Sequence, residues 1–252
     1  KRAFISRWGE EGSLVEFDFS QLEVAVLAHV TTDLQLIDDI NHGRDIHSEL
    51  FNQMYKRFPT KDERKWFKRL TFGLIYGAGA KTLAENAGCD VTVAKDFIRT
   101  FYDRYPGVLL WNLNIEKRAK TEGKYVGEDI TKTWNLMTET GRLYVFKEYL
   151  SKFSDTKTHN FSPTELKNYP IQGLATGDIV PMMLGILFRK LIGRDDVKLV
   201  NTVHDSILLD VKDTILNKTI REVRQTLHNT HKYFEASFGK PLALKLTAGV
   251  QV

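Results

Sequence analysis

The chain has 252 residues, of which 42% are hydrophobic and 27% charged, so it can bury a substantial core and is not a disordered polymer. Its single cysteine, Cys89, excludes an internal disulfide framework and a thiolate metal cluster, which leaves oxygen and imidazole as metal ligands. The net charge of +4 is small, so binding of nucleic acid has to be inferred from local patches.

The hydropathy pattern contains no uninterrupted apolar run of about 18 residues, and the first residues lack the order of a secretory signal. We therefore expect an intracellular protein with no membrane partner.

The first strong element is an apolar strand predicted over residues 14–19, which delivers Asp18 close to its end. A helix is predicted to start near Ser20. The spacing of Ser20 and Glu23 is that of a capping box, in which Glu23 would only stabilise the start of the helix. Beyond this point the middle of the chain is predicted to be mostly helical.

A helix predicted over about residues 62–77 carries four side chains at a spacing of four, so they share one face. They are Arg64, Lys68, Phe72 and Tyr76. Two cations followed by two aromatic rings suit a triphosphate at one end and a stacked base at the other. The alternative is an amphipathic helix with a solvated basic stripe, which does not explain why the stripe ends in Tyr76-Gly77.

Two β segments predicted over about 197–211 form a hairpin around His204-Asp205-Ser206. An aspartate at such a tip can simply stabilise the turn by bonding to its own backbone. Asp18, however, also lies at a strand end. If the two strands are neighbours in one sheet, the carboxylates repel each other and are most easily stabilised by a hard divalent cation such as Mg²⁺. This arrangement is typical of two-metal phosphoryl transfer.

These segments resemble, in order, the motifs of family A DNA polymerases, the bacterial DNA polymerase I family, including its phage-type members. Asp18-Phe19-Ser20-Gln21-Leu22-Glu23 resembles motif A, the series from Arg64 to Gly77 resembles motif B, and Val203-His204-Asp205 resembles motif C. Shorter matches follow the same order: Asp45-Ile46-His47, Tyr105-Pro106-Gly107, Thr140-Gly141-Arg142 and Asn168-Tyr169-Pro170-Ile171-Gln172-Gly173.

The resemblance implies an α+β fold: a polymerase palm with a small antiparallel sheet, plus an inserted helical fingers subdomain. On this division the palm comprises residues 1–30 and 161–252, and the fingers comprise residues 31–160. It also implies a DNA-directed DNA polymerase that adds deoxynucleotides to a primer 3′-hydroxyl. Its partners would be primer–template DNA and deoxynucleoside triphosphates. The resemblance would also place the protein in the cytoplasm of a bacterial or phage-infected cell, with an organelle as the alternative.

The resemblance further assigns roles to single residues. Asp18 and Asp205 would hold two Mg²⁺ ions, with Mn²⁺ as an alternative, and Lys68 would donate a proton to pyrophosphate. The nucleotide would contact Arg64, Lys68, Phe72, Tyr76, Glu23, His47 and Gln21. The primer and template would contact Asn168, Gln172, His204, Tyr76 and Gly77. In this interpretation Glu23 lies under the sugar and excludes a 2′-hydroxyl.

Three positions depart from the family pattern: Ser206 replaces a usual glutamate, and Ala25 and Thr164 replace usual arginines. We expect altered metal dependence from the first change and a weaker hold on DNA from the other two. Because the chain begins shortly before Asp18, we expect the thumb and exonuclease region to lie in a longer polymerase or in a second chain.

Two alternatives from other functional classes stay open. A non-catalytic nucleic-acid-binding subunit of a split polymerase would not need both acids, and both are present. A relative of the single-subunit RNA polymerases would have to admit a ribose, against which Glu23 argues.

Overall fold

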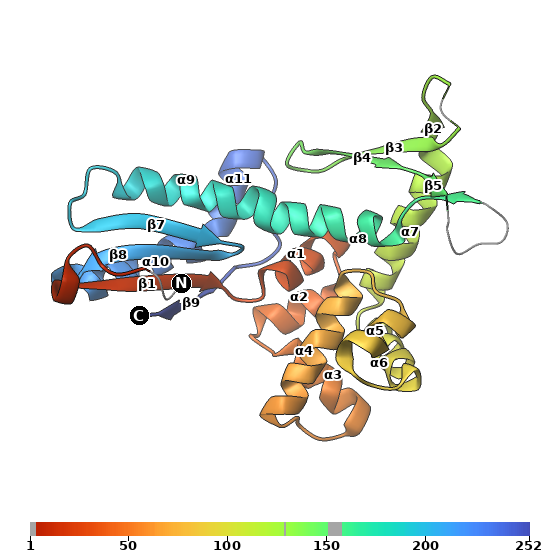
Figure 1. Ribbon diagram of the computed structural model, residues 1–252, viewed down its shortest axis with the longest axis horizontal. Coiled ribbons are helices and arrows are strands. Elements are labelled where there is room, and N and C mark those ends of the chain that lie inside the picture. The colour runs from red at the N-terminus through yellow and green to blue at the C-terminus, as the bar shows by residue number, and fades with distance from the viewer. Residues whose placement is uncertain (1–3, 129, 151–157) are drawn as a thin grey trace. The chain divides into compact units, whose positions relative to one another are not determined.

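The computed structural model describes residues 4–128, 130–150 and 158–252 (Figure 1). The chain divides into two compact units, the first within residues 1–26 and 172–252 and the second within residues 27–171. Both boundaries lie inside helices, at residues 26/27 and 171/172, whereas the resemblance implies divisions after residues 30 and 160.

The first unit is built on an antiparallel sheet with the strand order β7-β8-β1-β9. Its strands are β1 (Gly12–Phe19), β7 (Val197–Val203), β8 (Ser206–Lys212) and β9 (Ala248–Gln251). Side chains alternate in β1, so that Val15, Phe17 and Phe19 are buried and the residues between them are not. The sheet therefore has one apolar face that needs a cover.

Helices α9 (Val180–Leu191), α10 (Leu216–His228) and α11 (Thr230–Phe238) pack in this unit, α9 against β7 and α10 against β1 and β8. Short 3-10 turns, η1 (Gly9–Glu11) and η3 (Asp213–Ile215), flank the strands. The helices bury Met183, Leu187, Val223, Leu227 and Phe234, which close the core over the apolar face.

Helix α8 (Pro163–Gln172), the π-helical turn η2 (Gly173–Ile179) and α9 join into one helix, Pro163–Leu191. Among the described residues it alone is long and apolar enough to cross a membrane by length and composition, with a mean hydropathy of 1.5. The sequence still contains no uninterrupted apolar run of this length, because polar residues interrupt the apolar ones along this helix. Core helices of water-soluble proteins pass the same test, and 39% of the apolar window is buried.

The second unit is mainly helical. Its helices are α1 (Leu22–Thr31, which starts in the first unit), α2 (Leu34–Asn41), α3 (Ile46–Tyr55), α4 (Lys61–Ile75), α5 (Ala80–Ala87), α6 (Val91–Arg104) and α7 (Pro106–Glu122). An aromatic cluster joins three of them, because the Phe67 ring lies edge-on to Phe51 at 4.9 Å and to Phe97 at 5.4 Å. This cluster packs α4 firmly against α3 and α6.

A small sheet interrupts the region that the sequence predicts to be mostly helical. Its strands are β2 (Lys124–Tyr125), β3 (Lys132–Met137) and β4 (Leu143–Lys147), and a separate pair is formed by β5 (Tyr149–Leu150) and β6 (His159–Asn160). Trp134 and Phe146 stack at 5.7 Å and pack with Ile115 and Leu166. Alternating strands this short give a weak sequence signal.

The Tyr105-Pro106-Gly107 motif joins α2 to the start of α7. The Tyr105 hydroxyl donates to Asp39 at 2.9 Å, and the Gly107 N–H donates to Asp33 Oδ2 at 2.7 Å. Asp33 also caps α2, since its Oδ1 accepts from the Leu36 N–H at 2.8 Å. The motif is therefore a packing joint between helices.

Gly107→Ala is expected to destabilise the protein by about 1–3 kcal/mol, because the added methyl would lie 2.9 Å from the Asp33 Cα, a backbone atom. The measurement is urea denaturation. The control is Gly185→Ala in α9, where the methyl would meet only the end of the Arg189 side chain at 3.7 Å. Helix propensity should make the control neutral or more stable. Equal stability of the two variants would contradict the packing argument.

Candidate functional site

Asp18 and Asp205 lie at the same end of the sheet. The antiparallel register pairs Asp18 with Ser206, the residue after Asp205, and the Phe19 N–H donates to the Asp205 carbonyl at 3.4 Å. Asp18 is exposed on the face of β1 opposite the buried Phe17, and Asp205 is half-buried. Two residues 187 positions apart are thus brought side by side.

The oxygen atoms of this pair suit a hard cation such as Mg²⁺. No group of three or more His, Cys, Asp or Glu side chains that could hold a metal occurs within the described parts of the chain. Two carboxylates alone do not complete a coordination shell, so water and a phosphate-bearing substrate would have to supply the remaining oxygen ligands.

The hairpin that carries Asp205 turns within two residues, His204 and Asp205, between β7 and β8. His204 adopts φ = 56°, a left-handed conformation that is uncommon for residues other than glycine. The tight turn therefore carries local strain next to the acid. Strained positions that a fold maintains are frequent at functional sites.

Ser206 closes this turn instead of extending the acidic pair. Its side chain is 3% exposed, and its Oγ donates to the Val203 carbonyl at 3.1 Å. Thr202 Oγ1 donates in turn to the Ser206 carbonyl at 3.0 Å. The departure from the family pattern thus contributes turn hydrogen bonds and no charge.

Glu23 does not form the capping box that its spacing suggests. The helix begins at Leu22, and Gln21 before it has φ = 53°, so Ser20 lies outside the helix and is not its N-cap. The Ser20 N–H, which a capping box would direct to Glu23, donates to the Thr247 carbonyl at 2.8 Å. A capping box therefore does not explain the presence of Glu23.

Gln21, which is expected to bind nucleotide, holds a buried polar atom beside this turn. Its Oε1 has no hydrogen-bond partner among the described residues. Buried acceptors are nearly always bonded, so this oxygen lacks a partner that a buried acceptor normally has, and no described residue supplies one.

A second group of predicted site residues lies on α4, in the second unit. Thr60 starts this helix with a complete capping box, since its hydroxyl accepts from the Glu63 N–H at 3.3 Å and its N–H donates to Glu63 at 2.8 Å. Gly77 ends it with φ = 82°, which glycine adopts without strain. The observed helix agrees closely with the predicted one.

The predicted face of α4 is accessible from solvent. Arg64 and Lys68 are exposed, and Phe72 and Tyr76 are half-buried. The Lys68 Nζ lies 5.5 Å from the Phe72 ring centroid, and the Phe72 and Tyr76 rings lie 6.0 Å apart. The cations and rings therefore form one continuous surface along the helix.

His47 lies behind this surface. Its side chain is 1% exposed, and burial lowers its pKa to about 4, so the imidazole is neutral at pH 7. The Thr71 hydroxyl donates to the Phe67 carbonyl at 2.9 Å, so its oxygen accepts from His47 Nδ1 at 3.1 Å. The ring packs 5.8 Å from Phe72, which makes it a support for that ring in this structure.

Arg64 forms a bidentate ion pair with Asp45. Its Nε donates to Asp45 Oδ2 at 2.7 Å and its Nη2 donates to Oδ1 at 2.9 Å. Burial raises the pKa of Asp45, but hydrogen bonds from Arg64 and Ser48 outweigh it, and the net pKa lies below the ordinary value. The spacing of Asp45 and Ser48 indicates a helix N-cap, but no local pattern indicates the pairing of Asp45 with Arg64.

The residues expected to contact primer and template lie on α8, just after α4 and in the hairpin turn between β7 and β8. Asn168 is half-buried and Gln172 is exposed, four residues later on the same helix. Gly77 lies against the start of α8, since a methyl group on it would come within 3.0 Å of the Thr164 Cα. Thr164, which replaces the usual arginine, therefore lies next to the glycine that ends α4.

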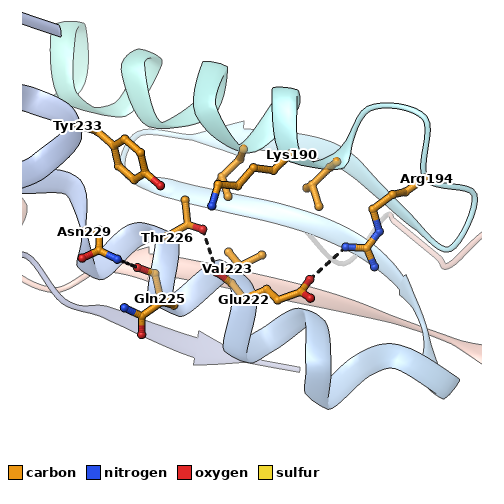
Figure 2. A pocket seen from close by; sticks show the side chains of 10 residues that line it. Lys190, Arg194, Glu222, Val223, Gln225, Thr226, Asn229 and Tyr233 are labelled. Atoms are coloured by element: carbon orange, nitrogen blue, oxygen red, sulfur yellow. Dashed lines mark hydrogen bonds and ion pairs between the residues drawn. The ribbon is translucent and has the colours of Figure 1, made fainter. Parts of the chain in front are cut away.

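The first unit also contains a pocket of about 360 Å³ between α9, α10 and α11 (Figure 2). Arg194 points toward Glu222 there, at 3.1 Å, and Lys190 lies 6.0 Å from the Tyr233 ring. None of its lining residues belongs to the predicted site. Arg194, which lines the pocket, comes shortly before the start of β7, whereas Asp205 follows the end of β7. The pocket is therefore separate from the turn that carries Asp205.

The family model described as DNA polymerase family A matches residues 1–251. The chain belongs to DNA polymerase family A. It is 31% identical over 241 residues to DNA polymerase I of Lactococcus lactis subsp. lactis (strain IL1403), covering 90% of this chain and 25% of that protein. It is 28% identical over 263 residues to the DNA polymerase of Bacillus phage SP01, covering 99% of this chain and 27% of that protein.

Among solved structures, this family A chain is similar to the POL domain of Pol1 from M. smegmatis, which was solved in complex with DNA primer-template and dNTP. The TM-score is 0.72 at 24% identity, covering 98% of this chain and 40% of that one. The expected α+β fold, a palm with a small antiparallel sheet and inserted helical fingers, is confirmed. The chain spans about a quarter of the length of the curated relatives it matches.

Proposed function

We propose that this chain is the catalytic core of a DNA-directed DNA polymerase, which transfers deoxynucleotides to a primer 3′-hydroxyl under the direction of a template. The observation that carries the proposal is the adjacency of Asp18 and Asp205 at one end of the antiparallel sheet. The exposed face of α4 supports it independently. The palm would comprise about residues 1–30 and 161–252, and the fingers about residues 31–160.

Asp18 and Asp205 would together hold two Mg²⁺ ions, with Mn²⁺ as an alternative. These ions would activate the primer hydroxyl as a nucleophile and neutralise charge on the leaving pyrophosphate. The protein's own contribution would be the register of β1 and β8, which places Asp18 beside Ser206 and so keeps the backbones of the two acids close together before substrate binds.

The nucleotide would bind along α4. Arg64 and Lys68 would neutralise the phosphates, and Lys68 would also donate a proton to the departing pyrophosphate. Phe72, supported by His47, and Tyr76 would offer ring faces to the nucleotide and the template base. Gln21 would offer its unpaired Oε1 to the bound nucleotide as an acceptor.

Primer–template DNA would contact Asn168, Gln172, His204, Tyr76 and Gly77. Polar side chains suit the minor groove, whose acceptor pattern hardly varies with sequence, as an enzyme that copies any template requires. A thumb and an exonuclease, in a longer protein or a second chain, stay a prediction. The bacterial and phage relatives support the cytoplasm as the location.

The test is extension of a labelled primer by the 252-residue chain with Mg²⁺ and four deoxynucleoside triphosphates. We expect incorporation that follows the template, with short products because Ala25 and Thr164 replace cations that would hold DNA. A folded chain that extends no primer with either Mg²⁺ or Mn²⁺ would point to the non-catalytic alternative. Incorporation that ignores the template would also contradict the proposal.

Glu23→Ala is expected to raise ribonucleotide incorporation relative to deoxyribonucleotide by at least about tenfold, or roughly 1.4 kcal/mol of discrimination. In this proposal the side chain lies under the sugar and excludes a 2′-hydroxyl. The measurement is kcat/KM for a matched ribo- and deoxyribonucleoside triphosphate pair on one primer–template.

Two further variants sharpen this experiment. Glu23→Gln keeps the bulk of the side chain and should retain most of the discrimination, whereas Tyr76→Phe should shift it less than alanine does if its hydroxyl holds the carboxylate. An unchanged sugar preference in Glu23→Ala would remove the main argument for DNA over RNA synthesis.

A further inference from the structure

Two hydrogen bonds from Ser48 hold the Asp45 carboxylate in place, independently of Arg64. Asp45 is the N-cap of α3, and its Oδ2 accepts from the Ser48 N–H at 3.2 Å and from the Ser48 hydroxyl. The carboxylate is therefore fixed to the start of one helix. Arg64, its partner, belongs to the first turns of the next helix, 19 residues later.

The pair uses only part of the Arg64 guanidinium. An arginine has five N–H donors, and Asp45 engages one on Nε and one on Nη2. The other three form no hydrogen bond with any described residue, and the Arg64 side chain is 47% exposed. The guanidinium plane is thus set by protein contacts while its outer edge stays open to a ligand.

We propose that Asp45 is a positioning residue, which holds Arg64 in the orientation that binds the triphosphate of the incoming nucleotide. This inference rests on the proposed function. A free arginine side chain loses rotamer entropy when it is immobilised, and a pair formed beforehand removes part of that loss from the binding step.

The negative charge of Asp45 also has an effect on phosphate binding that opposes its positioning role. Asp45 is also an anion next to a phosphate-binding cation, so its charge weakens the attraction of phosphate to Arg64. If orientation dominates, removal of the charge weakens nucleotide binding. If repulsion dominates, the same change strengthens it. The sign of the effect therefore distinguishes a positioning residue from a competitor for Arg64.

Asp45→Asn is a suitable variant, because asparagine caps a helix as well as aspartate does but lacks the charge that strengthens the Arg64 pair. We expect KM for a deoxynucleoside triphosphate to rise about tenfold in primer extension, with kcat changed less than about threefold. The dissociation constant of the nucleotide, measured by equilibrium titration with Mg²⁺, should rise by the same factor.

Glu63→Gln is the matched control. Glu63 accepts from both terminal guanidinium nitrogens of Arg57, Nη1 at 2.9 Å and Nη2 at 2.5 Å, at the start of α4 itself. Its exposure resembles that of Asp45, 30% against 28%, and glutamine preserves its capping box. Neither Arg57 nor Glu63 belongs to the proposed site, so KM should change less than about twofold.

A double-mutant cycle completes the test. If Asp45 acts through Arg64, Asp45→Asn should change KM less than about twofold when Arg64 is already alanine. An unchanged or lowered KM in Asp45→Asn, or an equal rise in the Arg64→Ala background, would overturn the inference alone. A wild-type chain that binds no nucleotide and extends no primer would overturn the proposed function, and this inference with it.

Discussion

Primer extension is expected to fall at least about 1,000-fold in Asp18→Asn and in Asp205→Asn, equivalent to roughly 4 kcal/mol of activation free energy. Each change removes one of the two carboxylates at the same end of the sheet while keeping the shape of the side chain. Because both residues lie at the solvent-accessible end of the sheet, the fold should persist. The measurement is the rate of single-nucleotide insertion with Mg²⁺, together with thermal denaturation of each variant.

The control for this experiment lies at the other end of the same strand. Asp213 follows β8, is exposed, and accepts a hydrogen bond from the Ser13 hydroxyl at 2.6 Å. Asp213→Asn should extend primers at close to the wild-type rate. The assignment of the acids fails if Asp18→Asn or Asp205→Asn keeps a near-normal rate, or if activity disappears only because the variant unfolds.

Lys68→Ala is expected to lower the rate of insertion at saturating nucleotide about 100-fold, with little change in stability. Lys68 is exposed on α4, one turn after Arg64, so its loss removes charge beside the transferred phosphates rather than packing. The measurement is kcat for insertion of one nucleotide. Lys65→Ala, one position from Arg64 on a neighbouring face of the helix, should change the rate less than about threefold.

Lys68→Arg separates two contributions of this side chain. An arginine keeps the positive charge but does not give up a proton in proteins, because its pKa is above about 12. If Lys68 donates a proton to pyrophosphate, Lys68→Arg should remain about as slow as Lys68→Ala. Recovery of most of the rate would show that charge alone matters.

Local patterns in the sequence predicted the elements that carry the candidate site. The spacing of four between Arg64 and Tyr76 specifies one helix face, because neighbouring residues determine the helical period. The two β segments around Asp205 likewise predicted a hairpin, and its strands and turn were found there. Strand-end positions also suggested that Asp18 and Asp205 meet.

Other features depended on residues far apart in the chain. The Ser20 N–H donates to the Thr247 carbonyl rather than to Glu23, so a contact with the C-terminal segment replaces the capping box that the local spacing predicts. The small sheet around Trp134 depends on packing against α7 and α8. The apolar length of the Pro163–Leu191 helix is apparent only because α8, η2 and α9 join into one helix.

The sequence by itself therefore determined the family, the order of the motifs and the side chains that share each face, since all of these follow from residue identity and short-range periodicity. Only the tertiary structure decided which partners those side chains have. It placed Ser206 opposite Asp18, Asp45 on Arg64 and His47 behind Phe72. The physical reason is that strand register and helix packing are set by burial across the whole chain, which no local pattern encodes.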